Sequence, residues 1–247
     1  MPRYKLTIEY DGTGYYGWQH QQGLTTVQGT IEKAVEQLCG QYCEVYGSGR
    51  TDAGVHAMGQ VAHINLPRSY ELHKIFGALN FYLIDTAIII KEVKEVEETF
   101  HARFSARHRS YLYRIVNRQA PLALDHTRAW HVRVQLDNVL MHEAAQVFVG
   151  EHDFTSFRAS ECQAKSPVKR LDTFTVKRVN EEEIQCHVSA RSFLHHQVRN
   201  MVGALMEVGR GRWTAEDIQK ALLAKDRQAA KQTAPAHGLY LTQILYD

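Results

Sequence analysis

Alternation of apolar and polar positions predicts the strands of this chain. Residues 4–10 (YKLTIEY) alternate, as in a strand with one face on a core. The same period of two runs through residues 110–117. Residues 173–179 and 183–190 form a pair that predicts a β-hairpin. Further strands are expected over residues 42–46, 61–66, 87–96 and 238–246, with 87–96 buried.

Apolar positions spaced three and four residues apart predict the helices. The clearest stripe lies within residues 193–208, where apolar side chains recur from Leu194 to Val208. Other helices are expected over residues 27–38, over 71–79, from an Asp137 cap to Gly150, and over 214–224. This order predicts an α+β fold of two halves with a similar plan, residues 1–105 and 106–247.

The composition of one stretch, residues 45–60 (VYGSGRTDAGVHAMGQ), indicates a binding site rather than a packing surface. Three glycines in its first ten residues allow close approach of other groups, and Arg50 and Asp52 lie between them. Asp52 has no neighbouring acid, so it cannot form a carboxylate pair of the glycosidase kind. Arg50 favours its ionised form. Nucleophile, base, metal ligand and structural ion pair all remain open for Asp52.

Composition and charge narrow the class of protein. The chain has 247 residues, of which 44% are hydrophobic and 23% charged, as in ordinary soluble globular proteins. Its four cysteines lack CxxC spacing, and we expect free thiols in a cytoplasmic protein. We expect no signal peptide and no membrane span, because the first residues lead directly into an alternating strand pattern and no apolar run reaches the length of a membrane span.

The distribution of charge is more informative than the net value of +2. Residues 101–133 hold seven arginines against one acid, Asp125, interleaved with aromatic side chains. The arginines are Arg103, Arg107, Arg109, Arg114, Arg118, Arg128 and Arg133. Such a stretch suits phosphates and stacked bases, or else forms a solvated strand edge.

Two further side chains have alternatives that pattern alone leaves open. Tyr111 and Tyr113 point to one face of their strand, and we expect one in the core and the other at a site. Arg199 lies at the edge of the helical stripe in residues 193–208. It is either a fixed cation aimed at an anion or a surface arginine lying over apolar neighbours.

Nucleotide-binding and metal motifs are missing: there is no P-loop, no GxGxxG, and His195 and His196 are adjacent rather than four residues apart. We therefore expect no cofactor and no metal. His56, His63, His195 and His196 are expected to be structural or RNA-contacting. A hydrolase using Asp52 with nearby histidines stays as an alternative that requires a bound metal.

Six motifs, taken together and in order, resemble the bacterial tRNA pseudouridine synthase A (TruA) family. They are YDGTGYYGWQHQ at 10–21, GSGRTDAGVHA at 47–57, FHARFSARHRSYLY at 100–113, DFTSFRA at 153–159, FLHHQVRNMVGALMEVG at 193–209 and GLYL at 238–241. The resemblance implies isomerisation of uridine to pseudouridine at positions 38, 39 and 40 of the tRNA anticodon arm. It also implies a homodimer whose subunits have antiparallel sheets flanked by helices and a basic cleft between the halves.

The same resemblance implies roles for four residues. Asp52 is the essential catalytic carboxylate, and Arg50 helps to open the stem and hold the flipped nucleotide. Tyr111 stacks on the uracil, and Arg199 pairs with Asp52. Whether Asp52 attacks C1′ or takes the 2′ proton of the ribose is left open. The competing class is a non-catalytic tRNA-binding protein or tRNA folding chaperone, which loss of the aspartate or its arginine would favour.

Overall fold

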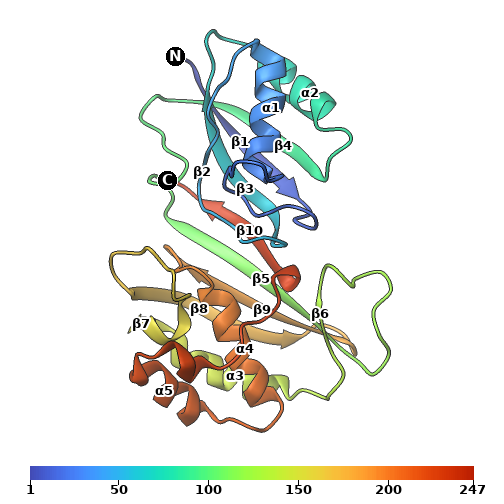
Figure 1. The fold of residues 1–247 in the computed structure, drawn as a ribbon. Helices are drawn as coiled ribbons and strands as arrows, with labels where there is room; N and C mark the ends of the chain where they lie inside the picture. Colours follow the sequence, from blue (N-terminus) through green and yellow to red (C-terminus); the bar gives the residue numbers. More distant parts are fainter. The chain divides into compact units, whose positions relative to one another are not determined.

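The alternating residues at the start of the chain form β1 (Arg3–Tyr10), in which every second side chain is buried. The computed structural model describes residues 1–247 and divides into two compact units, residues 1–107 with 240–247 and residues 108–239 (Figure 1). The last eight residues thus belong with the first unit. Both units are mixtures of helices and mainly antiparallel strands, which confirms the α+β fold class.

In the first unit, β1 is the inner strand of a sheet. It pairs antiparallel with β3 (His56–Asn65) on one side and β4 (Ile88–Val96) on the other. Beyond β3, the short β2 (Tyr46–Gly47) pairs antiparallel and the C-terminal β10 (Leu239–Leu245) pairs parallel. The final strand of the chain therefore lies beside the strand that leaves the Asp52 loop.

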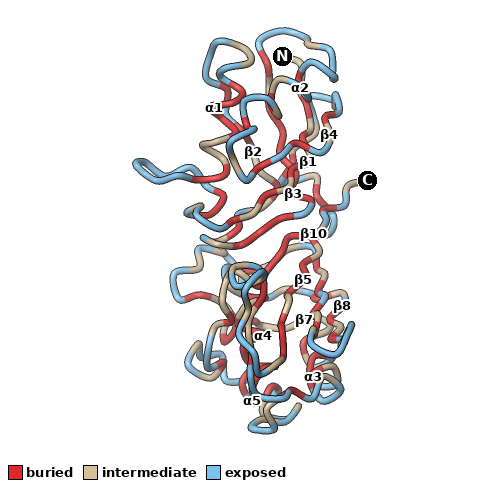
Figure 2. The backbone as a smooth tube through the Cα atoms, turned by 90° about the vertical axis from the view of Figure 1, so that its right-hand side faces the viewer, coloured by how far each residue is buried: buried red, intermediate tan, exposed pale blue.

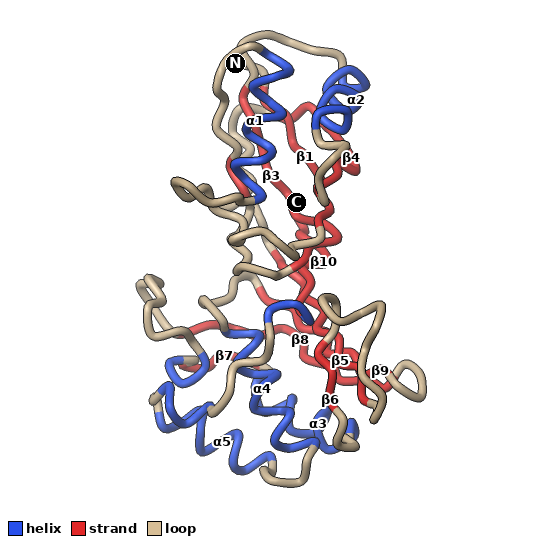
Figure 3. Tube along the Cα trace, turned by 45° about the vertical axis from the view of Figure 1, so that its right-hand side comes forward, coloured by secondary structure: helices blue, strands red, loops and turns tan.

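Two helices, α1 (Val27–Cys39) and α2 (Leu72–Tyr82), cover one face of this sheet (Figures 1 and 3). The side chain of Thr26 accepts a hydrogen bond from the Gly29 N–H and so caps α1. Gly40, at φ 76°, ends the helix in the left-handed conformation.

In the second unit, β9 (Glu183–Ala190) lies between β5 (His108–Asn117) and β8 (Val168–Arg178). The predicted hairpin of β8 and β9 is confirmed. The short β7 (Gly150–Asp153) extends the sheet beside β8, and β6 (Trp130–Val132) runs parallel to β5.

Three helices lie on one face of the strands of the second unit: α3 (Asn138–Ala145), α4 (Gln197–Gly209) and α5 (Ala215–Ala224) (Figure 3). Buried backbone follows α4 and the strands (Figure 2). Short 3-10 helices span Gln146–Phe148, Thr155–Phe157, Arg227–Ala230 and Ala236–Gly238. No helix combines the length and apolar character that crossing a bilayer requires.

Some predicted elements were wrong in extent, and tertiary contacts explain why. The strand expected over residues 42–46 is reduced to Tyr46–Gly47, because only these two residues pair with β3. The strand over 87–96 is half-exposed rather than buried, since β4 is the edge of its sheet.

Other corrections concern helix ends and a loop. α4 begins at Gln197 instead of residue 193, because His196 takes a left-handed conformation at φ 61°. α2 continues to Tyr82, three residues beyond its expected end. In the motif at residues 153–159, Phe154 and Phe157 are fully buried in the core of the second unit.

Candidate active site

The loop between β2 and β3 carries Arg50 and Asp52, and β3 holds its first half. Gln60, fully buried on β3, accepts a hydrogen bond from the Ser48 hydroxyl at 2.8 Å. Its amide nitrogen donates to the Gly49 carbonyl at 2.9 Å. Sequence reasoning missed this residue, although an amide side chain between the apolar residues Met58 and Val61 was its signal. Gln60 thus fixes the backbone that leads to Arg50.

The second half of the loop is held by the segment that follows β1. The Trp18 N–H donates to the Thr51 carbonyl at 3.0 Å, and the Gly54 N–H donates to the Tyr15 carbonyl at 3.4 Å. The hydroxyls of Tyr10 and Thr51 share a buried hydrogen bond of 2.7 Å. Asp52 therefore lies between two residues whose backbones are anchored to a neighbouring segment.

Glycine makes this close approach possible. Gly17 has φ +83°, and a Cβ added there would lie 2.7 Å from the Thr51 carbonyl oxygen. A Cβ on Gly47 would lie 2.4 Å from the indole nitrogen of Trp18. Trp18 itself is 2% exposed, whereas Tyr16 is 56% exposed. The motif at residues 10–21 is therefore chiefly the support of the Asp52 loop, with Tyr16 displayed beside it.

Arg50 and Asp52 differ in their surroundings within this loop. Asp52 is half-buried, and Arg50 is exposed. The Arg50 guanidinium has no ion-pair partner within the chain, so its charge is available to an anionic ligand. A carboxylate on an anchored backbone with an exposed cation two residues away is suited to a reaction on a phosphate-bearing substrate.

Two histidines near this loop are structural. His56 and His63 are each 2% exposed. The Nδ1 atom of His56 accepts a hydrogen bond from the Gly12 N–H at 3.1 Å, and that of His63 accepts one from the Ala102 N–H at 3.2 Å. Burial, followed by the charges of Arg3 and His101, lowers the pKa of His63 to about 4.

The second unit supplies the tyrosines, and their environments differ. Tyr113 is fully buried, and its hydroxyl donates to the Pro235 carbonyl at 2.8 Å. Burial raises the pKa of Tyr113 well above its usual value, although the charge of Arg199 opposes this. Tyr111 retains 9% exposure and contacts Phe193 edge-to-face at 5.1 Å. Both tyrosines are buried, Tyr113 completely and Tyr111 with a small part of its surface exposed.

Arg199 is held in place on α4 rather than lying loosely over the surface. Its Nε atom donates to the Ala234 carbonyl at 2.8 Å, and its own carbonyl accepts from the Ala234 N–H at 3.0 Å. The side chain is half-buried. Of the two alternatives considered for this residue, the structure favours the cation with a fixed position.

The basic stretch at residues 101–133 is less available to phosphates than its sequence indicates. Four of its arginines bind acceptors within their own unit. These pairs are Arg107 with Asp247, Arg109 with the carbonyl of Arg191, Arg114 with Glu183, and Arg118 with Glu182. The pattern could not reveal this, because three of the four acceptors lie on β9 or next to it and the fourth is at the C-terminus.

Comparison with known proteins agrees with the motifs. The sequence profile described as tRNA pseudouridine synthase matches residues 6–105 and 144–247. Proteins named tRNA pseudouridine synthase A from Brucella ovis, Brucella suis and Brucella melitensis are each 57% identical to the chain over 248 residues. The alignments cover 100% of the chain and 98% of each relative. The chain therefore belongs to the tRNA pseudouridine synthase family and is an isomerase that acts on tRNA.

Proposed function

We propose that this enzyme converts uridine to pseudouridine at positions 38, 39 and 40 of the tRNA anticodon arm, with Asp52 as its essential catalytic carboxylate. The observation that supports Asp52 most strongly is the double anchoring of its loop, by Gln60 on one side and by residues 10–18 on the other. A loop held at both ends keeps a catalytic group within the tolerance that chemistry requires.

The proposed reaction needs only rearrangement of bonds. The N1–C1′ glycosidic bond breaks, the uracil turns, and a C5–C1′ bond forms, after which the proton on C5 moves to nitrogen. No atom is lost and nothing is oxidised, so no metal or organic cofactor is required. Ionised Asp52 takes part either by attacking C1′ or by accepting the 2′ proton of the ribose.

The remaining residues of the proposed site deal with access to the base. A uridine in a stem must leave its stack, which costs a few kcal/mol. The unpaired cation of Arg50 offsets this cost by holding the phosphates of the extruded nucleotide. Tyr111 stacks on the uracil, and Arg199 keeps Asp52 ionised.

We further propose that the protein is a cytoplasmic homodimer. Sedimentation equilibrium at micromolar concentration tests the dimer directly. A mass of twice 28.3 kDa is expected, and a single-subunit mass at all concentrations would contradict it.

The decisive experiment compares wild-type protein with Asp52→Asn on an unmodified tRNA transcript, with no metal or cofactor added. Pseudouridine is located by carbodiimide-dependent primer-extension stops. Wild type is expected to modify the anticodon arm, and Asp52→Asn to bind the transcript without forming product. Asp85→Asn is a matched control, because Asp85 is an exposed aspartate of the same unit outside every motif.

Each outcome tests one part of the proposed function. Product from Asp52→Asn at the wild-type rate would remove Asp52 from the mechanism. Pseudouridine outside the anticodon arm would refute the proposed target. Tight binding by wild type without any product would favour the tRNA-binding or chaperone alternative.

A further inference from the structure

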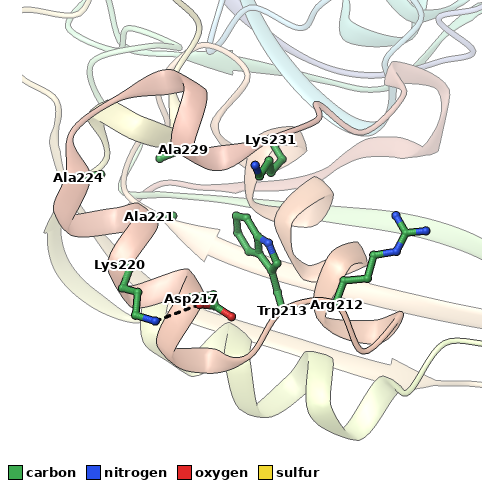
Figure 4. A pocket seen from close by; sticks show the side chains of 8 residues that line it. All are labelled: Arg212, Trp213, Asp217, Lys220, Ala221, Ala224, Ala229 and Lys231. Carbon is green, nitrogen blue, oxygen red and sulfur yellow. Dashed lines mark hydrogen bonds and ion pairs between the residues drawn. The ribbon is translucent and has the colours of Figure 1, made fainter.

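A pocket of about 480 Å³ lies in the second unit, away from the Asp52 loop in sequence, where the end of α4 meets α5 and the segment 227–231 (Figure 4). Trp213, half-buried, provides its one aromatic surface. The other lining residues are Arg212, Asp217, Lys220, Ala221, Ala224, Ala229 and Lys231.

The charges around this pocket are not balanced. Lys231 is exposed and has no ion-pair partner in the chain. Arg212 shares the single carboxylate of Glu207 with Arg210, each at 3.5 Å. The remaining acid, Asp217, is occupied by Lys220 at 3.2 Å and by the N–H of Thr214 at 3.1 Å. Among the lining residues themselves, three cations (Arg212, Lys220 and Lys231) face one carboxylate (Asp217), which leaves an excess of two positive charges.

The backbone that presents Lys231 is unusual. Lys231 has φ 58° and ψ −130°, a conformation that costs an L-residue roughly 1–3 kcal/mol and persists only when neighbours enforce it. Its carbonyl accepts a hydrogen bond from Arg227 at 3.1 Å. The next carbonyl, that of Gln232, approaches α4 so closely that a Cβ on Gly203 would lie 2.1 Å away. The backbone that carries the exposed Lys231 side chain is therefore held in place.

The segment that carries Lys231 also binds Arg199. Ala234, three residues after Lys231, makes the two hydrogen bonds that hold Arg199. Arg227 donates to Asn200, the neighbour of Arg199 on α4, at 3.0 Å. Ten residues of helix separate Arg199 from the end of α4, a distance of about 15 Å. The pocket and Arg199 are thus two positions on one rigid scaffold.

We propose that this pocket is an accessory tRNA-binding site, in which one base stacks on Trp213 while a flanking phosphate binds Lys231 and Arg212. Stacking on an aromatic ring beside cations is a common way to bind unpaired nucleotides. This inference rests on the tRNA substrate of the proposed function, and it assigns a contact distinct from the residues that handle the target uridine.

The lining favours a nucleotide within an RNA chain over a free nucleotide. Three of the eight lining residues are alanines, whose side chains offer no group that could hydrogen-bond a base edge. Stacking and charge alone give weak, sequence-tolerant binding. Such a contact becomes effective when the same RNA is already bound elsewhere on the protein, because the second binding step is then intramolecular.

The test measures tRNA affinity and steady-state kinetics for Lys231→Gln, Arg212→Gln, Trp213→Ala and Trp213→Phe, using an unmodified tRNA transcript. Each glutamine variant is expected to raise Kd and KM about threefold to tenfold and leave kcat unchanged. The slope of log K against log salt is expected to fall by about one. Trp213→Ala is expected to weaken binding at least fivefold, and Trp213→Phe less, because phenylalanine retains a stacking face.

Lys33→Gln is the matched control, since it removes one exposed, unpaired lysine from α1 in the other unit. Equal changes in Kd for Lys33→Gln and Lys231→Gln, or an unchanged Kd for both Lys231→Gln and Trp213→Ala, would overturn the proposal. The midpoint of thermal unfolding identifies any variant that is misfolded. If Trp213→Ala is misfolded, the Kd values of Trp213→Phe and Arg212→Gln test the proposal instead. Failure of the proposed function is separate, because wild type itself would then form no pseudouridine.

Discussion

Replacing Gly17 by alanine tests whether the segment after β1 positions the Asp52 loop. The new Cβ would lie 2.7 Å from the Thr51 carbonyl oxygen and 3.2 Å from the carbonyl carbon of Asp52. Both atoms belong to backbone, so no flexible side chain can move aside. Relief requires a displacement of the loop itself.

Gly17→Ala is expected to lower stability in two ways, through an unfavourable backbone conformation and through overpacking. Substitution of a second glycine, Gly14, measures the first effect alone. Gly14 has nearly the same backbone, at φ +85° against +83°, but a Cβ there would meet nothing within 4 Å. Gly14→Ala therefore carries only the left-handed penalty of about 1–2 kcal/mol. Gly17→Ala carries this penalty and an overpacking cost of roughly 1–3 kcal/mol.

Gly14→Ala and Gly17→Ala should differ more in the rate of pseudouridine formation than in stability. Restoring an ordinary contact of about 3.4 Å moves the Thr51 carbonyl by roughly 0.7 Å, and a shift of this size costs roughly 10- to 100-fold in rate. Urea unfolding and single-turnover pseudouridine formation are measured for both variants. We expect Gly14→Ala to keep the wild-type rate and Gly17→Ala to react roughly 10- to 100-fold more slowly. Equal stability and equal rates for the two variants would refute the support assigned to residues 10–18.

Two further predictions concern charge. The pKa of His63 is about 4, against 6.5 for the unfolded residue, so the unfolded chain binds a proton that the folded state does not. Stability should therefore fall as the pH drops from 7.5 to 5, by up to about 2 kcal/mol, and His63→Asn should flatten this dependence in urea titrations; an unchanged slope would contradict the assignment. Arg114 is bound by both oxygens of Glu183 at 2.9 and 3.1 Å, so Arg114→Gln should lower the free energy of unfolding by about 1–3 kcal/mol. The same variant should leave tRNA affinity and its salt dependence unchanged, and a reduced salt slope would place Arg114 at the RNA instead.

Local patterning was sufficient for most of the elements. The Asp137 and Thr214 caps, the helix with Ile31 on its buried face, and the β8–β9 hairpin are all as expected. These features depend on neighbours in sequence. Predictions failed where the outcome depends on a distant partner, as in the shortened β2 and the half-exposed β4.

For the candidate site, the sequence identified the loop but not what holds it. Glycine spacing around Arg50 and Asp52 is visible in the chain, whereas the support by Gln60, Tyr10 and Trp18 joins residues up to 41 positions apart. Motif order also predicted the family, which the comparisons confirm. The roles of Arg50, Asp52, Tyr111 and Arg199 stay predictions for the experiments above.

The sequence by itself determined the fold class, the family and the glycine-framed aspartate, because periodicity, capping and motif spacing are properties of adjacent residues. Only the tertiary structure decided which charged and aromatic side chains remain free to bind. It placed carboxylates against Arg107, Arg114 and Arg118, and it buried Tyr113. It also left Lys231 without an ion pair beside Trp213, since burial and ion pairing depend on which distant segments the fold brings into contact.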